Sequence, residues 1–196
     1  MNINFQSIKN KQHLVHNILD SLKPDIVIGT EIWLNPNIKD AEAFSDEYKL
    51  YRRDHKGQQG GGVLLAINKN FISDEVEELH PGNDFEIIWA KLENKGSKTL
   101  YISSFYNPKT SDEKSLKNFD ISVRTSQIKN AALFIGGDFN LPGWDWKNRI
   151  LISNAVHSKN HYEFGNTLDD TGLLQLIEQP TRQDNTLDLM ITNLPN

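Results

Sequence analysis

A buried strand that ends in polar side chains is predicted at residues 132–140. An apolar run over residues 132–135 is followed by two glycines, and then by Asp138 and Asn140. Apolar runs of this length, bounded by glycine, are typical of strands covered on both faces. We expect a tight turn at the glycines, with both polar side chains pointing the same way from the carboxyl end of the strand. Open α/β folds place their catalytic and binding residues at such strand ends. The alternative to a functional role is a strand that simply ends in an Asx turn.

Length and charge limit the classes of protein to which the chain can belong. At 196 residues one domain is expected, with enough apolar surface for a core. The net charge of −5 argues against purely electrostatic binding of nucleic acid, but not against an enzyme that meets phosphates through a metal ion. The chain has no cysteine, which excludes thiolate metal sites. No apolar run is long enough to span a membrane, so we expect no membrane partner.

Hydrophobic periodicity predicts alternating helices and strands. Helical spacing of apolar residues predicts helices over residues 11–22, 112–128 and 161–170. Apolar runs and alternation predict strands over residues 1–5, 26–29, 48–53, 63–67, 76–79, 85–92, 99–105, 132–135, 173–177 and 187–191. Asn94-Lys95-Gly96 is typical of a hairpin turn, and Gly60-Gly61-Gly62 of a turn before a strand. No Gly-Lys-Ser/Thr follows the glycines, so they are not a phosphate-binding loop.

Polar side chains end, or nearly end, several of these predicted strands. They are Asn4, Glu31, Tyr106, and Asp138 with Asn140, while Asp188 is enclosed in an apolar run. A buried carboxylate is costly unless it is paired or hydrogen-bonded, so a group of this size favours one shared site over separate structural contacts. Carboxylates and amides, without cysteine or an obvious histidine pair, favour an oxygen-coordinated ion such as Mg²⁺ over zinc.

Five short motifs, in order along the chain, carry a family resemblance. They are Asn4-Phe5-Gln6-Ser7, Thr30-Glu31, Phe105-Tyr106-Asn107-Pro108, Gly137-Asp138-Phe139-Asn140 and Asn185-Thr186-Leu187-Asp188-Leu189. Together they resemble the endonuclease/exonuclease/phosphatase superfamily, and more narrowly the endonuclease domain that precedes reverse transcriptase in non-LTR retrotransposons. The phrase Pro180-Thr181-Arg182 supports the narrower resemblance. The resemblance implies one α/β domain over residues 1–196, a four-layer α/β/β/α sandwich that cuts DNA phosphodiesters with Mg²⁺ or Mn²⁺, and a reverse transcriptase domain in the full-length element.

The resemblance also assigns roles to the polar residues. By this likeness Glu31 binds the metal, with Asn4 beside it. Asp138 orients or deprotonates the attacking water. Asn140 contacts the phosphoryl oxygens, and Tyr106 helps to hold the phosphate. A loose, charge-rich phosphoryl transition state needs such positioning and neutralisation more than a protein nucleophile.

Asp188 marks a departure from the family pattern. By resemblance its carboxylate hydrogen-bonds a histidine that stabilises the pentacovalent phosphate, in a Ser-Asp-His motif on a further strand. No Ser-Asp-His occurs in this sequence. We therefore expect a domain clipped at both ends and lacking its final strand. Loss of one transition-state donor costs on the order of 10²–10³ in rate. By resemblance both the histidine and a neighbouring metal-linked Asp are missing, so we expect turnover at or below the limit of detection.

Several other residues have two readings each. Arg52, Arg53, His55 and Lys56 form a basic cluster that suits either a DNA backbone or a solvated loop. Glu86 suits either a residue that supports the metal site or an exposed strand residue.

Two aromatic residues and two histidines follow the strand that carries Asp138. Trp144 and Trp146 suit stacking on a displaced base, although packing within their loop is favoured. His157 and His161 are expected in a loop and on a helix surface rather than as substitutes for the absent histidine.

Two functions compete with a DNA endonuclease. One is a phosphomonoesterase of the same fold, acting on inositol or lipid phosphates. The other is a non-catalytic remnant that binds a partner or has no role.

Overall fold

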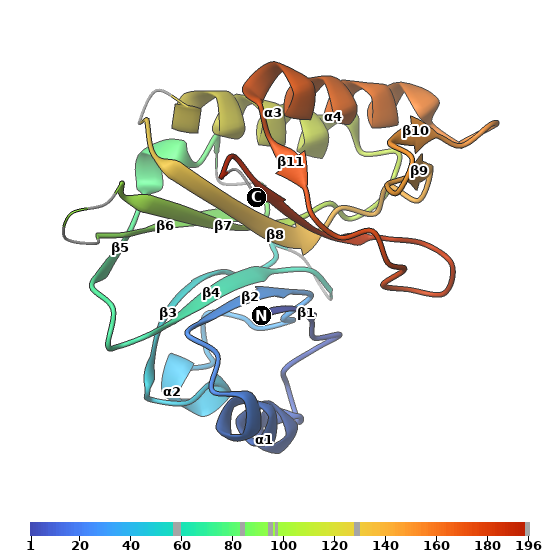
Figure 1. The fold of residues 1–196 in the computed structure, drawn as a ribbon. Helices are drawn as coiled ribbons and strands as arrows, with labels where there is room; N and C mark the ends of the chain where they lie inside the picture. The colour runs from blue at the N-terminus through green and yellow to red at the C-terminus, as the bar shows by residue number, and fades with distance from the viewer. Residues whose placement is uncertain (57–59, 83–84, 94–95, 97, 128–129, 195–196) are drawn as a thin grey trace.

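Two β-sheets pack face to face, and helices cover the outer face of each sheet (Figure 1). The computed structural model describes residues 1–56, 60–82, 85–93, 96, 98–127 and 130–194. Helices α1 (Gln12–Leu22) and α2 (Asp40–Ala43) cover one sheet, and α3 (Glu113–Gln127) and α4 (Ser158–Thr171) cover the other. The predicted four-layer α/β/β/α sandwich is confirmed. Within the described residues, no helix has the length and apolar character needed to cross a membrane.

The four-stranded sheet brings the ends of its first two strands together. Its strands, in spatial order, are β1 (Asn2–Asn4), β2 (Ile26–Thr30), β4 (Val63–Asn68) and β3 (Tyr48–Arg53). Strands β1 and β2 run parallel, and Asn4 is in register with Thr30. Because parallel strands end at the same edge, Asn4 lies beside the residue that precedes Glu31.

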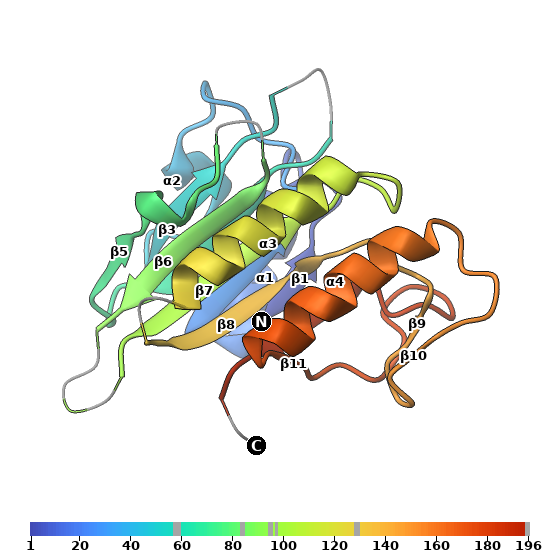
Figure 2. The same cartoon turned by 90° about the horizontal axis from the view of Figure 1, so that it is seen from above.

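The six-stranded sheet aligns three further candidates in one row. Its strands, in spatial order, are β11 (Leu174–Gln175), β12 (Asp188–Thr192), β8 (Ala132–Asp138), β7 (Leu100–Tyr106), β6 (Ile87–Leu92) and β5 (Ser73–Glu75). In the parallel pair of β7 and β8, Tyr106 is in register with Asp138. In the antiparallel pair of β8 and β12, Asp188 is in register with Asp138. The row lies at one end of strands β7, β8 and β12. Figure 2 shows β7 and β8 side by side, behind helices α3 and α4 in that view.

Strand β4 is apolar from residue 63 to residue 67 because both of its faces are buried. Leu64 packs in the cluster that includes Val15 of α1, on the outer side of its sheet. Leu65 packs in the cluster between the two sheets, which includes Ile88 and Ile102. Alternate residues of one strand therefore serve two cores, which explains why the sequence of this strand is a continuous apolar run.

Some predicted elements differ from the structure. Residues 76–79, predicted as a strand, form the 3₁₀ helix η1 (Glu77–Leu79), and the neighbouring strand β5 ends at Glu75. Val76 and Leu79 are both buried, and their spacing of three suits a helical turn better than a strand. A short hairpin of β9 (Trp144–Asp145) and β10 (Ile150–Leu151) was not predicted. The hairpin turn predicted at residues 94–96 lies largely outside the described residues.

Strand β8 continues through both glycines, so the tight turn predicted before Asp138 is wrong. Gly137 has a φ of +146°, and a Cβ atom there would lie 1.8 Å from the carbonyl oxygen of Phe105. A Cβ atom at Gly136 would lie 2.8 Å from Sδ of Met190 and 2.9 Å from Cδ1 of Ile28. The glycines allow close approach of a neighbouring strand and of the opposite sheet.

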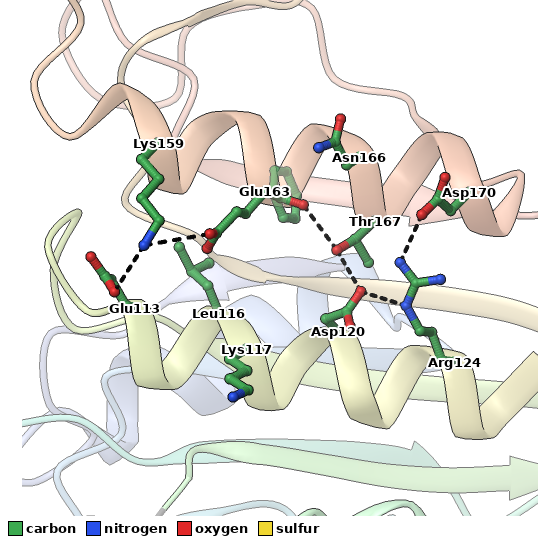
Figure 3. A pocket seen from close by; sticks show the side chains of 11 residues that line it. Glu113, Leu116, Lys117, Asp120, Arg124, Lys159, Glu163, Asn166, Thr167 and Asp170 are labelled. Atoms are coloured by element: carbon green, nitrogen blue, oxygen red, sulfur yellow. Dashed lines mark hydrogen bonds and ion pairs between the residues drawn. The ribbon is translucent and has the colours of Figure 1, made fainter.

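Helices α3 and α4 are joined across their outer groove by charged side chains (Figure 3). The groove has a volume of about 530 Å³. Arg124 of α3 contacts Asp120 at 2.8 Å and Asp170 of α4 at 2.9 Å, and Lys159 of α4 contacts Glu113 of α3 at 3.4 Å. These pairs occupy the groove with interactions of the helices themselves, on the outer side of the sheet, so it is not a candidate catalytic site.

Substitution of Gly137 by alanine should prevent stable folding. The new Cβ atom would overlap the backbone of β7, and we expect a loss of about 3 kcal/mol or more in the free energy of unfolding, measured by urea denaturation. Gly172→Ala is the matched control, since Gly172 also has a positive φ but has no atom near the position of a Cβ. It should lose about 1 kcal/mol from backbone strain alone. Equal losses in the two variants would contradict the close-approach argument.

Candidate active site

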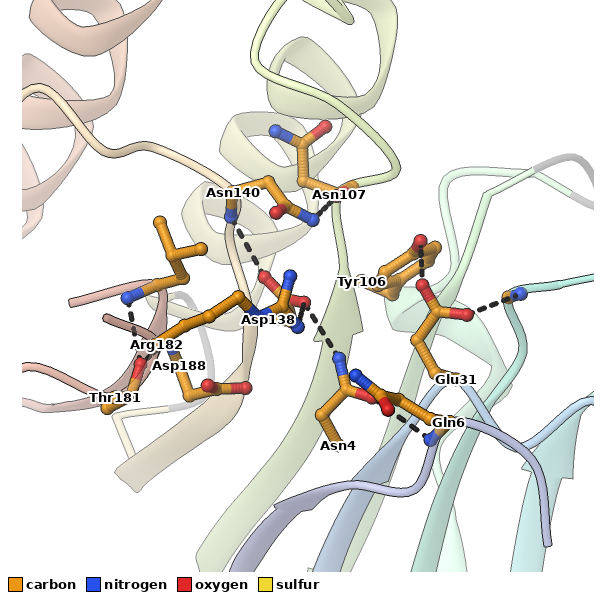
Figure 4. Close-up of polar contacts among 12 residues, drawn as sticks. Asn4, Gln6, Glu31, Tyr106, Asn107, Asp138, Asn140, Thr181, Arg182 and Asp188 are labelled. Atoms are coloured by element: carbon orange, nitrogen blue, oxygen red, sulfur yellow. Dashed lines mark hydrogen bonds and ion pairs between the residues drawn. The ribbon is translucent and has the colours of Figure 1, made fainter. Parts of the chain in front are cut away.

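The candidate site lies where strand ends of the two sheets meet (Figure 4). It gathers all six predicted residues: Asn4, Glu31, Tyr106, Asp138, Asn140 and Asp188. Nδ2 of Asn4 donates a hydrogen bond to Oδ2 of Asp138 at 2.9 Å, across 134 residues of sequence. The hydroxyl of Tyr106 donates to Oε1 of Glu31, across 75 residues. Each of these bonds joins one sheet to the other, so the residues form one site.

Glu31 is held by donors on both of its carboxylate oxygens. Oε2 accepts from Nε1 of Trp33 at 2.5 Å and from the backbone N–H of Gly61 at 3.1 Å, and Oε1 accepts from Tyr106. Glu31 itself has a φ of +53°, a conformation that side-chain-bearing residues rarely adopt and that is common at functional sites. Burial, and then the hydrogen bond to Glu31, raise the pKa of Tyr106, so its phenol stays a neutral donor.

Asp138 is almost completely buried, with 1% of its surface exposed. Oδ1 accepts from the backbone N–H of Asn140 at 3.1 Å, Oδ2 accepts from Asn4, and Nη2 of Arg182 lies 3.4 Å from Oδ2. Burial, and then the nearby charge of Asp188, raise the pKa of Asp138 to about 6. A carboxyl group with a pKa close to neutrality is suited to accept a proton at physiological pH.

Asp188 faces Asp138 from the neighbouring strand. The backbone N–H groups of Leu187 and Asp188 both donate to Oγ1 of Thr181 at 3.0 Å, which anchors the start of β12. Burial raises the pKa of Asp188. Its Oδ1 atom is buried and has no hydrogen-bond partner among the described residues. The site therefore contains an acceptor atom that a hydrogen-bond donor would stabilise.

Asn140 does not continue the extended chain of β8. Its φ of +47° and its N–H bond to Asp138 form an Asx turn. Nδ2 of Asn140 donates to the carbonyl oxygen of Asn107 at 2.7 Å, while Nδ2 of Asn107 donates to the carbonyl oxygen of Phe139 at 2.8 Å. The extended backbone from which we expected a common direction for Asp138 and Asn140 therefore ends at Asp138. The Asx turn proposed as the structural alternative is present within the site itself.

Two residues of the site had no role in the sequence prediction. Trp33 donates to Glu31, and no sequence pattern indicated this contact. Arg182 contacts Asp138, and the only signal was its place in Pro180-Thr181-Arg182. The side chain of Arg182 is 43% exposed, so its ion pair adds little stability, but the guanidinium group is open to an incoming anion.

The arginines of the basic cluster are used within the protein. Arg52 contacts Oδ1 of Asp40 at 2.9 Å and donates to the carbonyl oxygen of Ile38 at 2.6 Å. Arg53 donates to the carbonyl oxygen of Gly82 at 3.0 Å. Neither the DNA-backbone reading nor the solvated-loop reading describes these two guanidinium groups.

Trp144 and Trp146 pack within the protein. Their rings stack with centroids 5.2 Å apart and an interplanar angle of 25°, and Trp146 meets Phe164 edge-on. The favoured packing interpretation describes them better than stacking on a base. His161 is buried rather than on a helix surface, because its Nε2 accepts from the backbone N–H of Gly143 at 2.9 Å. The surface position expected for this histidine is wrong.

The donor set at the site fits a hard divalent cation. The candidate ligands are oxygen atoms of Glu31 and Asn4, and the Oδ1 atom of Asn4 also accepts from the N–H of Gln6 at 3.1 Å. Among the described residues, no cluster of three histidine, cysteine, aspartate or glutamate side chains could hold a metal. Mg²⁺ is typically bound by one or two carboxylates, with water and substrate phosphate completing its shell, and these residues match that requirement.

The stability of the folded chain should depend on pH through Asp138. In the folded chain the pKa of Asp138 is raised from the ordinary value of 3.8 to about 6. The protonated carboxyl group therefore contributes to the free energy of unfolding below pH 3.8, and this contribution is lost as the pH rises through about 6. Asp138→Asn should therefore gain stability relative to the wild type across this window, on the order of 1–3 kcal/mol. Urea denaturation in EDTA measures the difference. The hydrogen bond from Asn4 that the variant loses adds only a pH-independent offset. Asp46→Asn, at an exposed position, is the control. A stability difference between Asp138→Asn and the wild type that does not change with pH would contradict the raised pKa of Asp138.

Residues 1–191 match the endonuclease/exonuclease/phosphatase family in sequence. No curated protein matches the chain. Solved structures with similar folds include the endonuclease domain of TRAS1, a telomere-specific non-LTR retrotransposon, with a TM-score of 0.68, 15% identity and coverage of 97% of this chain and 82% of that chain. The AP endonuclease LMAP from Leishmania major has a TM-score of 0.71 and 16% identity, with coverage of 97% of this chain and 77% of that chain.

A third similar structure is a 3′ phosphatase, NExo from Neisseria, bound to a product DNA hairpin. It has a TM-score of 0.65 and 16% identity, and the match covers 97% of this chain and 84% of that chain. At such identities these likenesses show the fold, while the sequence match extends over nearly the whole chain. The chain is therefore a member of the endonuclease/exonuclease/phosphatase family, a family of hydrolytic enzymes.

Proposed function

We propose that this chain is a divalent-metal-dependent phosphodiesterase that acts on DNA, with the site of a non-LTR retrotransposon endonuclease. The observation that carries the proposal is the convergence of Glu31 and Asp138 from different sheets, each held by a donor from the opposite sheet. Donors fix both oxygens of each carboxylate. The pKa of Asp138 is raised to about 6, which suits this group for accepting a proton, while Glu31 is left for binding a cation.

Each role follows from the surroundings of the side chain. Glu31, with Asn4 beside it, would hold Mg²⁺ or Mn²⁺, which when bound neutralises charge on the phosphate. Asp138 would take the proton of the attacking water, and its bonds from Asn4 and Asn140 fix the direction of its oxygens. The neutral phenol of Tyr106 and the amide of Asn140 would hold phosphoryl oxygens. These groups stabilise charge that develops in the transition state.

Asp188 would orient a protonated imidazole toward the phosphate. In the family pattern this imidazole belongs to the Ser-Asp-His motif, which does not occur in this sequence. The unpartnered, buried Oδ1 atom of Asp188 is the feature of this chain that supports such a contact. The buried carboxylate would also keep that imidazole protonated, which is the state that stabilises the pentacovalent phosphate.

DNA is the proposed substrate, and a reverse transcriptase domain is the proposed neighbour in a full-length element. Support for DNA comes from the similar structures of a retrotransposon endonuclease and of a 3′ phosphatase with a DNA hairpin. The phrases Pro180-Thr181-Arg182 and Asn185-Thr186-Leu187-Asp188 support the retrotransposon type. A phosphomonoesterase is the second candidate, since one similar structure is named as a phosphatase. Release of inorganic phosphate from inositol phosphates without nicking of DNA would favour it.

The purified chain should nick supercoiled plasmid in the presence of Mg²⁺, and imidazole in the buffer should increase the rate. Free imidazole can donate to the open Oδ1 atom of Asp188 and recover about 10-fold of the rate that a transition-state donor supplies. Asp138→Ala should reduce nicking by a factor on the order of 10²–10³ or more, since it removes the proton acceptor. Conversion of supercoiled to open-circular plasmid on a gel gives both rates.

The controls separate the enzyme from contaminants. EDTA should abolish nicking, and Asp188→Asn should remove the increase with imidazole. Asp184→Asn, at an exposed position in the loop that precedes β12, should behave as the wild type. Equal nicking by wild type and Asp138→Ala would refute the proposed catalytic site.

A further inference from the structure

Glu86 lies immediately before β6, and its carboxylate holds a glycine turn. Oε2 accepts from the backbone N–H of Gly62 at 2.6 Å, and Oε1 pairs with Nδ1 of His55. The side chain is only 13% exposed, and burial raises the pKa of its carboxyl group. Of the two readings that the sequence allowed, an exposed strand residue is therefore wrong. A buried carboxylate has a desolvation cost, which these two contacts offset.

The same turn contacts Glu31 on its other side. The N–H of Gly61 donates to Oε2 of Glu31 at 3.1 Å. The carbonyl oxygen of Gly61 accepts from the backbone N–H of Trp33 at 3.1 Å, and the indole of Trp33 also donates to Glu31. Two consecutive glycines thus join the carboxylate of Glu86 to the carboxylate of Glu31.

The turn is confined on both sides. Gly61 has a φ of +60°, and a Cβ atom there would lie 2.6 Å from Oε1 of Glu86 and 2.9 Å from Nδ1 of His55. Gly62 has a φ of +84°, and a Cβ atom there would lie 2.7 Å from Cγ1 of Ile32. Only glycine fits at either position without displacing the side chain of Glu86 or of Ile32.

The main chain of Glu86 also contacts Tyr106, the residue whose hydroxyl is a second donor to Glu31. The backbone N–H of Tyr106 donates to the carbonyl oxygen of Glu86 at 2.9 Å, and the Tyr106 hydroxyl donates to Oε1 of Glu31. The bond from Tyr106 joins main chains and does not need the carboxylate of Glu86. The Glu86 side chain therefore acts on Glu31 through the glycine turn, at Oε2.

We propose that Glu86 is a positioning residue for Glu31, acting through the turn at Gly61 and Gly62. The inference rests on the proposed function, in which Glu31 binds the divalent cation. Without the Glu86 carboxylate, the N–H of Gly61 is free to leave Oε2, and Glu31 loses its fixed direction. Partners that orient a metal ligand typically contribute 10- to 100-fold to metal affinity.

The indole N–H resonance of Trp33 tests the positioning in the absence of metal. Glu86→Ala should shift this resonance in a ¹H–¹⁵N spectrum, since the indole donates to Glu31. The indole of Trp89, which donates to Ser122 at 2.8 Å elsewhere in the core, should not shift and serves as the internal control. Trp33→Phe assigns the peak. A Trp33 resonance that is unchanged in Glu86→Ala would overturn the proposal.

Mn²⁺ affinity, measured from the free-ion signal in electron paramagnetic resonance, tests the consequence. Glu86→Ala should weaken binding by about 10-fold or more. Glu86→Gln should stay within about threefold of the wild type, because its amide oxygen can still accept from Gly62. Glu93→Ala, just beyond the other end of β6, is the matched control and should bind as the wild type. Equal loss in Glu86→Gln and Glu86→Ala would assign the effect to charge and overturn the positioning role.

A second pair of variants covers the case in which Glu86→Ala does not fold. Gly61→Ala should weaken Mn²⁺ binding, since its Cβ atom displaces Glu86. Gly60 also has a positive φ, but no atom lies near the position of a Cβ there, so Gly60→Ala should bind Mn²⁺ as the wild type does. Equal affinities in the two variants would overturn the proposal.

The Mn²⁺ affinities distinguish a failure of the proposed function from a failure of the positioning role of Glu86. If Mn²⁺ binding to the wild type does not depend on Glu31, as judged with Glu31→Gln, the proposed function fails. If that binding depends on Glu31 but not on Glu86, only the positioning role fails.

Discussion

The hydrogen bond from Asn4 to Asp138 joins the ends of β1 and β8 across the sandwich, and the rest of the site depends on it. It can form only if the two sheets keep a fixed separation and offset. Deeper between the sheets, Oγ of Ser104 donates to the carbonyl oxygen of Gly29 at 2.9 Å. A hydrogen bond in a buried environment is costly to leave unmade, so these polar contacts specify how the sheets align. That alignment brings Glu31 within reach of Tyr106.

Excess negative charge is the second property that organises the site. Asp138 and Asp188 face each other on adjacent strands, and Glu86 is buried nearby behind the glycine turn. Burial raises the pKa of all three carboxyl groups. Ionised together, they destabilise the fold, whereas a bound cation or a bound proton offsets the repulsion. A site that is unfavourable to the folded chain on its own is typical of functional rather than structural residues.

The sequence predicted the layers of the fold because periodicity reports burial directly. Strand β4 is a continuous apolar run since both of its faces are covered, and α1 has an apolar face that includes Val15 and Leu19. The 3₁₀ helix at Glu77–Leu79 was mistaken for a strand because a single buried pair, Val76 and Leu79, does not define a period. The glycines of β8 were mistaken for a turn. A glycine can be required either by a positive φ or by the close approach of a neighbouring strand, and the sequence does not distinguish the two.

The site residues at or directly after strand ends could be predicted from the sequence, whereas Trp33 and Arg182 could not. Asn4, Tyr106 and Asp138 are placed by strand register, which the order of motifs already implies. Trp33 and Arg182 reach the site from loops, whose conformations depend on tertiary contacts that no local pattern records. The roles of these residues in catalysis stay proposals.

The most direct measurement is the location of Mn²⁺ by anomalous scattering in crystals of the chain. We expect a peak bonded to a carboxylate oxygen of Glu31, on the side of Asn4, which is lost in Glu31→Gln. No peak at Glu31, with Mn²⁺ bound instead to exposed acidic groups such as Asp74, would contradict a cation site between the two sheets.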